Sequence, residues 1–533
     1  MFTGTLKPYQ PEAVDRMVER GSMLVAYEMG LGKTVCAIAA CEELMEQQRI
    51  GAPVLVIALS SLKYQWQKEI HKFSNSKALV IDGTRKQREA QYDEAREWSD
   101  NGVDYVVVNY ETVVNDWELI RRLDIGAIVC DEATAIKSFR SKRSKKVKEL
   151  SKKIDIRFAL TGTPVENGKP EELYSIMQFV DKDVLGRFDL FDDTFIVRNQ
   201  WGGVQRYRNL PVLHKKLMEA SVRKSQNDPD VAPYLPDTIH RDPLYVKMHP
   251  AAAKAYNLTA SALLDELAEA QNLFGGNFSL AAHYGQGHQV GGPADAMRGS
   301  MMSKITVLRM LADHPQLLLD SAAKFAELSG EGSQYAYALL EEHPEIADAL
   351  TKAGSPKVEA VLRYIEDHLD TDPDAKVVVF TTYLGVLPIL HDRLSAKNIK
   401  ANLYSGMMNA KEKEESKTEF QTSTNVRVLI SSDAGGYGVD LPQANLLINF
   451  DLPWSAGTAV QRNSRIRRAS SRWPSVTIQD VLAARTIEER QWDMLQQKNA
   501  VADAVLDGKG VNSQGGIDLS VGSLYTFLSK TRP

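Results

Sequence analysis

The stretch EMGLGKT, residues 28–34, decides how the rest of the chain is interpreted. The apolar run 23–26 precedes it and the apolar, helix-forming run 35–41 follows it, a pattern that predicts a strand, a loop and a helix. Glycines let a loop backbone wrap closely around phosphates, and the N-terminus of the next helix favours anions. In such a loop Lys33 would reach the β- and γ-phosphates of a nucleotide, and the hydroxyl of Thr34 would hold Mg²⁺.

The loop meets the general phosphate-binding pattern only in part. The full pattern places a glycine five residues before Gly32, and this chain has Tyr27 there. With its strand and helix flanks, the stretch favours nucleotide binding through Gly30, Leu31 and Gly32. An ordinary glycine-rich turn that caps a helix is the alternative.

Length and composition limit the class of protein. The 533 residues predict roughly three domains, or two with large insertions. Hydrophobic residues make up 43% and charged residues 25%, as in ordinary soluble globular proteins. Because the formal net charge is −5, contact with nucleic acid must come from local basic patches. No apolar run approaches the roughly 18 residues that cross a membrane, and no signal-peptide pattern begins the chain, so we expect a cytoplasmic protein without a membrane partner.

Neither the cysteines nor the histidines form a metal-binding pattern. Cys36, Cys41 and Cys130 lack metal-ligand spacing, and their apolar surroundings predict buried thiols. The glycine-rich stretch 274–292 contains His283 and His288, but no acid or cysteine there completes a set of ligands. A flexible loop is favoured over a metal site.

Two acids directly follow an apolar strand pattern. The run 127–130 leads into Asp131 and Glu132, downstream of the phosphate-binding loop. In that context Asp131 would hold Mg²⁺ through water, and Glu132 would orient or deprotonate the attacking water. A strand that is merely capped by two acids is the alternative.

Other polar residues stand at the ends of predicted strands. The runs 54–59 and 105–110 have the continuous apolar character of strands in a parallel sheet that is covered on both faces. Ser60, Ser61 and Asn109 fall at the ends of these strands, where open α/β sheets bind ligands. Contact with nucleic-acid phosphates and plain loop chemistry both fit.

A turn and a basic run extend this set. Thr161 and Thr163 close the strand 158–160 and would bond both the Asp-Glu loop and a nucleic-acid strand, although such a turn is ordinary on its own. Residues 137–153, beginning with Lys137, are rich in Lys and Arg. A solvated helix face and a phosphate-backbone contact explain the run equally well.

The second half of the chain predicts another α/β unit, which has no phosphate-binding loop of its own. Its apolar runs 377–380, 426–433 and 446–450, the first two separated by helical patterns, predict a parallel sheet. Thr382 and Ser432 fall at strand ends and are candidate nucleic-acid contacts. Residues 185–350, between the two units, look mostly helical.

Three polar side chains recur at helical spacing near the end of this unit. Gln461, Arg465 and Arg468 are three to four residues apart, which predicts one helix face. A guanidinium there would reach a γ-phosphate held by the other unit. A helix that binds anions or pairs with surface acids is the alternative.

In their order, these motifs resemble the Swi/Snf-type ATPases of helicase superfamily two. The resemblance runs from Leu6 to about Lys498, nearly the whole chain. The matching stretches are, in sequence order, residues 6–10, 28–34, 131–134, 160–164, 308–309, 314–315, 434–436, 461–468 and 486–489.

The resemblance implies an α/β fold of two RecA-like parallel-sheet lobes with helical insertions between them. ATP and Mg²⁺ would bind between the lobes and duplex DNA across an outer groove. Gln10 would read adenine, Gly436 and Gln461 would contact the nucleotide, and Arg465 and Arg468 would act across the cleft. The implied segments are lobe 1 at 1–185, helical protrusions and linker at 186–354, lobe 2 at 355–507 and a tail at 508–533.

Several positions depart from the family pattern. Tyr27 stands where the family usually has Asp, and Thr134 stands where it usually has His, a change expected to weaken coupling between the ATP and DNA sites. Arg467 replaces a frequent His, and residues 469–470 replace a frequent Ile-Gly. None of these changes removes a group that hydrolysis needs. The chain is close to a minimal motor, as in bacterial or phage members.

We therefore expect a monomeric, DNA-stimulated ATPase that moves along duplex DNA. Three alternatives stay open at this point. They are a strand-separating helicase for RNA or forked DNA, a nucleic-acid-binding module that uses ATP only as a conformational ligand, and another phosphate-binding-loop enzyme such as a small-molecule kinase.

Overall fold

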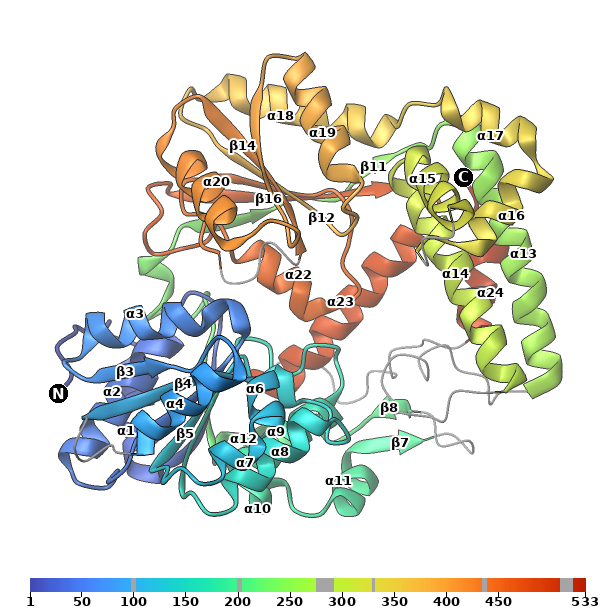
Figure 1. Ribbon diagram of the computed structural model, residues 1–533. Coiled ribbons are helices and arrows are strands. Elements are labelled where there is room, and N and C mark those ends of the chain that lie inside the picture. Colours follow the sequence, from blue (N-terminus) through green and yellow to red (C-terminus); the bar gives the residue numbers. More distant parts are fainter. Residues whose placement is uncertain (97–101, 199–203, 275–291, 328–330, 434–438, 509–520) are drawn as a thin grey trace. The chain divides into compact units, whose positions relative to one another are not determined.

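The computed structural model describes residues 1–96, 102–198, 204–274, 292–327, 331–433, 439–508 and 521–533. The chain forms two compact units (Figure 1). Unit 1 comprises Met1–Val197, Arg206–Leu235 and Lys498–Gly515, and unit 2 comprises Arg198–Gln205, Pro236–Gln497 and Gly516–Pro533. The predicted pair of parallel-sheet lobes with helical insertions is confirmed. The division into four segments stays a prediction.

Unit 1 contains a seven-stranded sheet in the order β3-β4-β2-β5-β6-β1-β9, and every neighbouring pair is parallel. The central strands are buried along their whole length, which explains why their sequences are continuously apolar. The strands are β1 (Ser22–Tyr27), β2 (Val54–Ala58), β3 (Lys77–Val80), β4 (Val103–Asn109), β5 (Ala127–Asp131), β6 (Ile156–Leu160) and β9 (Ser221–Lys224).

Helices flank this sheet and bury apolar faces against it (Figure 1). The α-helices are α1 (Pro11–Arg20), α2 (Lys33–Glu46), α3 (Lys63–Phe73), α4 (Arg85–Arg96), α6 (Tyr110–Asn115), α7 (Trp117–Ile120), α8 (Lys142–Ser151), α9 (Pro170–Val180), α10 (Lys182–Leu185), α11 (Phe188–Phe195) and α12 (Leu210–Met218). The 3₁₀ turns are η1 (Ser60–Leu62), η2 (Ala133–Ile136) and η3 (Ala232–Tyr234).

The mostly helical pattern expected for residues 185–350 is wrong for its first part. Five short strands lie among the described residues of this range, and β9 joins the sheet of unit 1 beside β1. These strands are only three or four residues long, so they carry too little alternation to be recognised in the sequence. The others are β7 (Ile196–Arg198) and β8 (Val204–Tyr207), which form a two-stranded sheet, and β10 (Asp237–His240) and β11 (Leu244–Val246).

Unit 2 contains a second parallel sheet in the order β10-β16-β15-β12-β14-β13, and β11 also pairs with β16. Its two faces are covered by separate apolar clusters. The strands are β12 (Val377–Thr381), β13 (Lys400–Tyr404), β14 (Val426–Ser432), β15 (Leu446–Asn449) and β16 (Ser475–Ala483). The helices around them are α18 (Pro356–Thr371), α19 (Val386–Ala396), α20 (Ala410–Thr422), α22 (Ala456–Asn463) and the first part of α23 (Ile487–Leu506), whose residues from Lys498 onward belong to unit 1.

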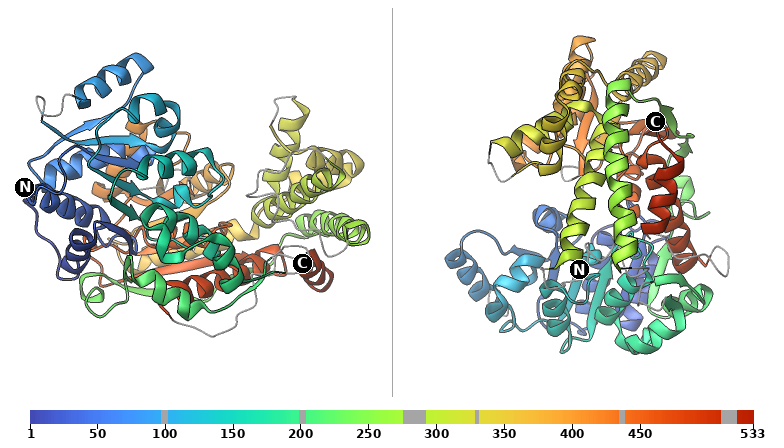
Figure 2. Two further views of the ribbon diagram at one scale, coloured as in Figure 1. Left: turned by 90° about the horizontal axis from the view of Figure 1, so that it is seen from below. Right: turned by 90° about the vertical axis from the view of Figure 1, so that its right-hand side faces the viewer.

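A helical subdomain completes unit 2, with an apolar core of its own. Two long helices, α13 (Pro250–Phe274) and α14 (Pro293–Asp313), lie side by side in Figures 1 and 2. The C-terminal helix α24 (Val521–Lys530) packs on α13, so part of the predicted tail is folded. The remaining helices are α15 (Pro315–Ala326), α16 (Gln334–Glu342) and α17 (Pro344–Thr351).

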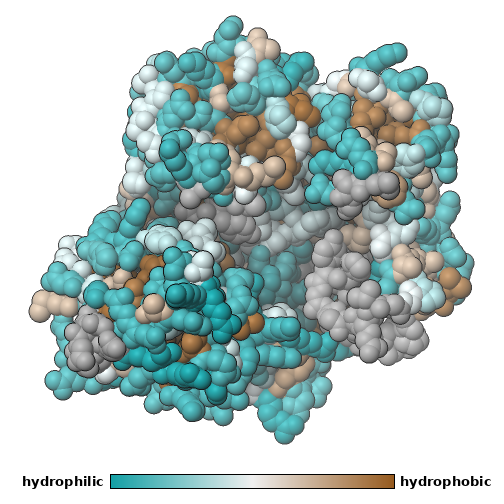
Figure 3. Space-filling view, viewed as in Figure 1, coloured by the Kyte–Doolittle hydropathy of each residue, from teal (hydrophilic) through white to brown (hydrophobic). Residues whose placement is uncertain are grey.

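The surface is largely hydrophilic on the face shown in Figure 3, with scattered hydrophobic patches. In the part of the chain that the structure describes, no helix has both the length and the apolar character needed to span a bilayer. The predicted buried thiols are confirmed, because Cys36, Cys41 and Cys130 are all buried and free.

Candidate active site

The predicted phosphate-binding loop connects β1 to α2 at the carboxyl edge of the unit 1 sheet. Gly30 and Gly32 have φ values of 79° and 80°, a left-handed conformation that favours glycine. A Cβ at residue 32 would lie 2.2 Å from Nε2 of Gln10. The left-handed conformation therefore favours glycine at position 32, and an added Cβ would also force the Gln10 amide to shift.

Lys33 begins α2 and folds back over the loop. Its ammonium donates to the carbonyl oxygens of Tyr27 at 3.0 Å and Glu28 at 3.4 Å. A Cβ at Gly162 would lie 3.5 Å from the Lys33 Nζ, so the turn after β6 rests directly on the loop. The next residue, Thr34, is half-buried in the first turn of the helix.

Gln10 is held against the same loop. Its side-chain oxygen accepts from the Lys7 N–H at 2.7 Å, and its amide donates to the Leu31 carbonyl oxygen at 3.0 Å. Gln10 is only 3% exposed. The structure thus brings Gln10 to the loop, while the reading of adenine stays a prediction.

Asp131 ends β5, which is separated from β1 in the sheet by β6 alone. Its Oδ2 accepts from the indole N–H of Trp66 at 2.8 Å, and its Oδ1 accepts from the Glu132 N–H at 3.0 Å. The Tyr110 hydroxyl donates to the Asp131 carbonyl oxygen at 2.7 Å. Burial raises the pKa of Asp131, and the Trp66 hydrogen bond and the charge of Lys33 oppose that rise.

Glu132 adopts an unusual backbone conformation. Its φ of 46° lies in the left-handed region, although it is not glycine. Such conformations cost of order 1–3 kcal/mol and persist where the surrounding structure determines them. Here η2 begins directly after Glu132, so the two acids sit on a sharp turn between strand and helix.

The predicted nucleic-acid residues of unit 1 fall into two groups. Ser60 and Ser61 are exposed in η1, after β2. By contrast, Asn109 caps α6 by accepting from the Thr112 N–H at 2.7 Å. The ammonium of Lys137 pairs with Glu166 at 2.5 Å. Asn109 and Lys137 therefore also stabilise the fold of unit 1.

The turn after β6 is held by its threonines. Thr161 is fully buried, and its hydroxyl accepts from the Thr163 N–H at 3.2 Å. Within the described ranges, the buried hydroxyl oxygen of Thr163 has no hydrogen-bond partner. Because the turn rests on the phosphate-binding loop, these residues lie beside the candidate nucleotide site.

In unit 2, Thr382 belongs to a buried ionic network. Its hydroxyl donates to Oδ1 of Asp451 at 2.6 Å, and Arg462 bridges Asp451 and Asp433 at 3.3 and 2.5 Å. Burial alone would raise the pKa of Asp451, but the nearby arginines, chiefly Arg462, outweigh it and the pKa is lowered. Ser432 is buried next to this network, and its hydroxyl accepts from the Gly406 N–H at 3.3 Å.

The prediction of one helix face for Gln461, Arg465 and Arg468 is wrong. Helix α22 ends at Asn463, so Arg465 lies in the turn that follows and Arg468 in the irregular segment after that turn. Arg468 donates to Oδ1 of Asp440 at 2.6 Å. All three predicted residues are at least nine-tenths buried. Gly436, the other predicted nucleotide contact of this unit, lies outside the described residues, as do His283 and His288.

The sequence did not reveal two residues, Arg223 and Gln226, whose hydrogen bonds support the phosphate-binding loop. The guanidinium of Arg223, on β9, donates to Glu28 at 2.7 Å and to Asp507 at 2.9 Å. The backbone and side chain of Gln226 donate to Glu28 at 2.8 Å and to the Met29 carbonyl oxygen at 2.7 Å. The one signal in the sequence was Glu28 itself, because an acid at the start of a loop that binds an anion needs a cationic or hydrogen-bonding partner.

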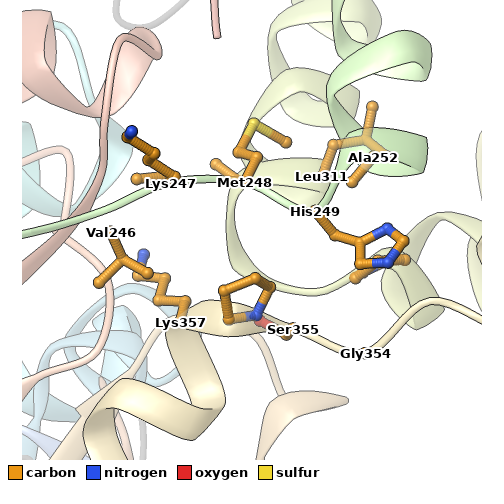
Figure 4. Close-up of a pocket in the computed structure, with 13 residues that line it drawn as sticks. Val246, Lys247, Met248, His249, Ala252, Leu311, Gly354, Ser355 and Lys357 are labelled. Carbon is orange, nitrogen blue, oxygen red and sulfur yellow. The ribbon is translucent and has the colours of Figure 1, made fainter.

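A hollow in unit 2 is not part of this site. About 240 Å³ of space, which includes open solvent, lies between β11 and the ends of α13, α14 and α18 (Figure 4). Lys357 borders it, but its ammonium is bonded at 2.7 Å to both Asp313 and Glu488. Among the described residues, no group of three or more potential metal ligands occurs.

Models of known families match both halves of the chain. The SNF2-related domain matches residues 9–316, and the helicase conserved C-terminal domain matches residues 356–470. The chain belongs to the SNF2-related family. The resemblance inferred from the order of the motifs is thereby confirmed.

Relatives of this SNF2-related chain include larger proteins. It is 25% identical over 508 residues to an uncharacterized ATP-dependent helicase of Mycoplasma pneumoniae, covering 94% of this chain and 42% of the relative. It is 24% identical over 519 residues to the putative ATP-dependent helicase/translocase YwqA of Bacillus subtilis, covering 95% and 49%. The chain thus spans less than half the length of these curated relatives.

A solved structure supports the fold of this SNF2-related chain. The helicase domain of Pyrococcus furiosus Hef aligns with a TM-score of 0.51 at 18% identity, covering 91% of this chain and 97% of that one. At this identity the likeness concerns the fold alone.

Proposed function

We propose that this chain is an ATPase that requires Mg²⁺ and is stimulated by duplex DNA, along which it moves as a monomer. One observation carries the proposal. Lys33, at the start of α2 after β1, and Asp131, at the end of β5, lie at the same carboxyl edge of the unit 1 sheet, where the charge of Lys33 opposes the rise in the pKa of Asp131. A phosphate chain and a hydrolytic water need this combination of groups.

The residues at this edge fit a magnesium nucleotide. Thr34 and Asp131 offer a hydroxyl and a carboxylate, the oxygen ligands that Mg²⁺ prefers. The tight approaches at Gly32 and Gly162 leave no room for side chains beside Lys33. When bound, Mg²⁺ neutralises charge on the β- and γ-phosphates.

Each side chain then has a proposed role. Lys33 binds the phosphates, Glu132 orients the attacking water or accepts its proton, and Gln10 reads adenine. From unit 2, Gln461 with Gly436 contacts the nucleotide. Arg465 and Arg468 stabilise negative charge on the transferred phosphoryl group, and Arg468 would first leave its pairing with Asp440.

Support for a DNA substrate comes from the exposed strand ends and from the helicase names of the relatives. Ser60 and Ser61 offer exposed hydroxyls just after the carboxyl end of β2, and α8 adds exposed lysines such as Lys142 and Lys145. The other proposed contacts are Asn109, Lys137, Thr161, Thr163, Thr382 and Ser432.

The test is steady-state ATP hydrolysis with no nucleic acid, single-stranded DNA, duplex DNA, forked DNA and RNA at low salt. We expect stimulation by duplex DNA without fork or end requirement. A strand-displacement assay beside a triplex-displacement assay separates movement along a duplex from unwinding. Turnover that no nucleic acid changes would contradict the proposed DNA coupling.

A further inference from the structure

Trp66 is a buried side chain that is not among the site residues named above. It lies on α3 and is 2% exposed, and its indole N–H donates to Oδ2 of Asp131 at 2.8 Å. The bond joins residues 65 positions apart in the chain. Through this bond α3 contacts the edge of the sheet where the two acids lie.

The geometry fixes the carboxylate of Asp131. Its Oδ1 already accepts from the Glu132 N–H at 3.0 Å, so the indole bond to Oδ2 determines the rotation of the carboxylate plane. An indole offers one hydrogen-bond donor and no acceptor. Trp66 can therefore only donate to the Asp131 carboxylate and cannot accept a hydrogen bond from it. The remaining lone pairs of the carboxylate keep a single orientation.

The indole itself is held in place by its neighbours on α3. Lys63 donates to the Ile81 carbonyl oxygen at 3.1 Å, and Gln67 donates to the Ala78 carbonyl oxygen at 2.9 Å. These bonds tie α3 to β3 and the residue after it (Figure 1). Trp66 itself belongs to the apolar core of unit 1. A rigid support behind a ligand is what keeps that ligand oriented.

We propose that Trp66 is a positioning residue that orients Asp131 for Mg²⁺. The inference rests on the proposed function, because it assigns Asp131 to the metal. Removing such a partner from behind a ligand typically lowers metal affinity or activity by 10- to 100-fold. A residue that served packing alone would change stability and leave metal affinity intact.

The test compares Trp66→Phe, which keeps an aromatic ring and loses the N–H, with Ile70→Val. Ile70 is fully buried on the same helix and in the same apolar cluster, so its variant removes volume without touching the hydrogen bond. Mn²⁺ binding in the presence of ADP is measured by electron paramagnetic resonance. ADP affinity in EDTA, duplex DNA affinity and the Mg²⁺ dependence of ATP hydrolysis are measured beside it.

We expect Trp66→Phe to lower the apparent Mn²⁺ affinity by about tenfold or more and to raise the Mg²⁺ concentration that hydrolysis needs by a similar factor. ADP affinity in EDTA and DNA affinity should match the wild type, and Ile70→Val should match it throughout. Equal Mn²⁺ affinity in Trp66→Phe and the wild type would overturn the inference alone. A wild type without metal-dependent ADP binding would overturn the proposed function as well.

A second measurement needs no variant and covers the case in which Trp66→Phe fails to fold. In protein labelled with ¹⁵N-tryptophan, the indole N–H signal of Trp66 should move when Mg²⁺ is added to the ADP complex. A signal that stays fixed during this titration would overturn the inference.

Discussion

Arg223 and Glu28 form an ion pair of 2.7 Å that connects the last strand of the unit 1 sheet to the first residue of the phosphate-binding loop. The two residues are 195 positions apart in the chain. The same guanidinium also donates to the Ala26 carbonyl oxygen at 3.0 Å and to Asp507 at 2.9 Å. One side chain therefore fixes the strand before the loop, the loop itself and the segment after α23.

Replacing Arg223 should weaken both the fold and nucleotide binding. In Arg223→Gln, Glu28 and Asp507 lose the cation that they share. We expect unit 1 to lose about 2–3 kcal/mol of stability. This loss is smaller than for a fully buried ion pair because both acids keep some contact with water. The KM for ATP should rise. Urea unfolding and ATP titration measure the two effects. Arg223→Lys keeps the charge but loses the paired N–H donors of the guanidinium, so its stability and its KM for ATP should lie between those of the wild type and Arg223→Gln. A wild-type KM in Arg223→Gln would contradict this role.

Alanine at position 32 should damage the loop more than its size suggests. The added Cβ would meet Gln10 Nε2 at 2.2 Å, and φ of 80° is strained for alanine, so we expect a loss of about 1–2 kcal/mol together with weaker ATP binding. The matched control is Gly299→Ala, where a Cβ meets nothing within 4 Å inside α14. That control should be neutral or stabilising by up to about 1 kcal/mol. Thermal unfolding and ATP titration compare Gly32→Ala with Gly299→Ala. Equal stability and equal ATP affinity in the two variants would contradict the steric argument.

Lys357 should be essential to the stability of unit 2. Its ammonium is buried between Asp313 and Glu488, each 2.7 Å away. Lys357→Met would leave two buried acids without their cation, a change worth about 3–5 kcal/mol. Adding Glu488→Gln to that variant should recover part of the loss, because one of the two charges is then removed. Chemical denaturation measures both, and a loss below about 1 kcal/mol in the single variant would refute the assignment.

Lys148 should make stability depend on pH. Burial lowers the pKa of its ammonium from 10.5 to about 8, and Nζ donates to Ser175 at 2.7 Å. Between these two pKa values the unfolded chain binds the proton more tightly than the folded protein, so this group's contribution to the unfolding free energy rises with pH across that window. The gain is at most about 3 kcal/mol.

The comparison for Lys148 is the variant Lys148→Met, which removes the titrating group and keeps most of the buried stem. The stability of the wild type relative to this variant should increase from pH 8 to pH 10. A difference that is flat with pH would show that the ammonium is not desolvated in the folded protein.

The sequence was sufficient to predict those parts of the fold and the candidate site that depend on residues adjacent in the chain. The loop at residues 28–34 and the acids Asp131 and Glu132 each follow a buried strand, and long apolar runs of this kind have few alternatives. The family follows from the order of such local motifs. These are statements about contiguous residues, and they need no knowledge of tertiary contacts.

The rest depends on contacts between distant residues. β9 is four residues long, so Arg223 carried no sign that it would reach the loop. Trp66 resembles any apolar residue of an amphipathic helix until its N–H is placed beside Asp131. The end of α22 at Asn463 was missed because the Arg spacing continues the helical period into the residues that follow.

The most direct test of the account is ATP hydrolysis by the wild type and by Lys33→Ala, each with and without duplex DNA. The account predicts DNA-stimulated hydrolysis by the wild type, none above background by Lys33→Ala, and unchanged DNA affinity in the variant, because the lysine ammonium lies over the phosphate-binding loop. Hydrolysis by Lys33→Ala at the wild-type rate would contradict the assignment of the active site.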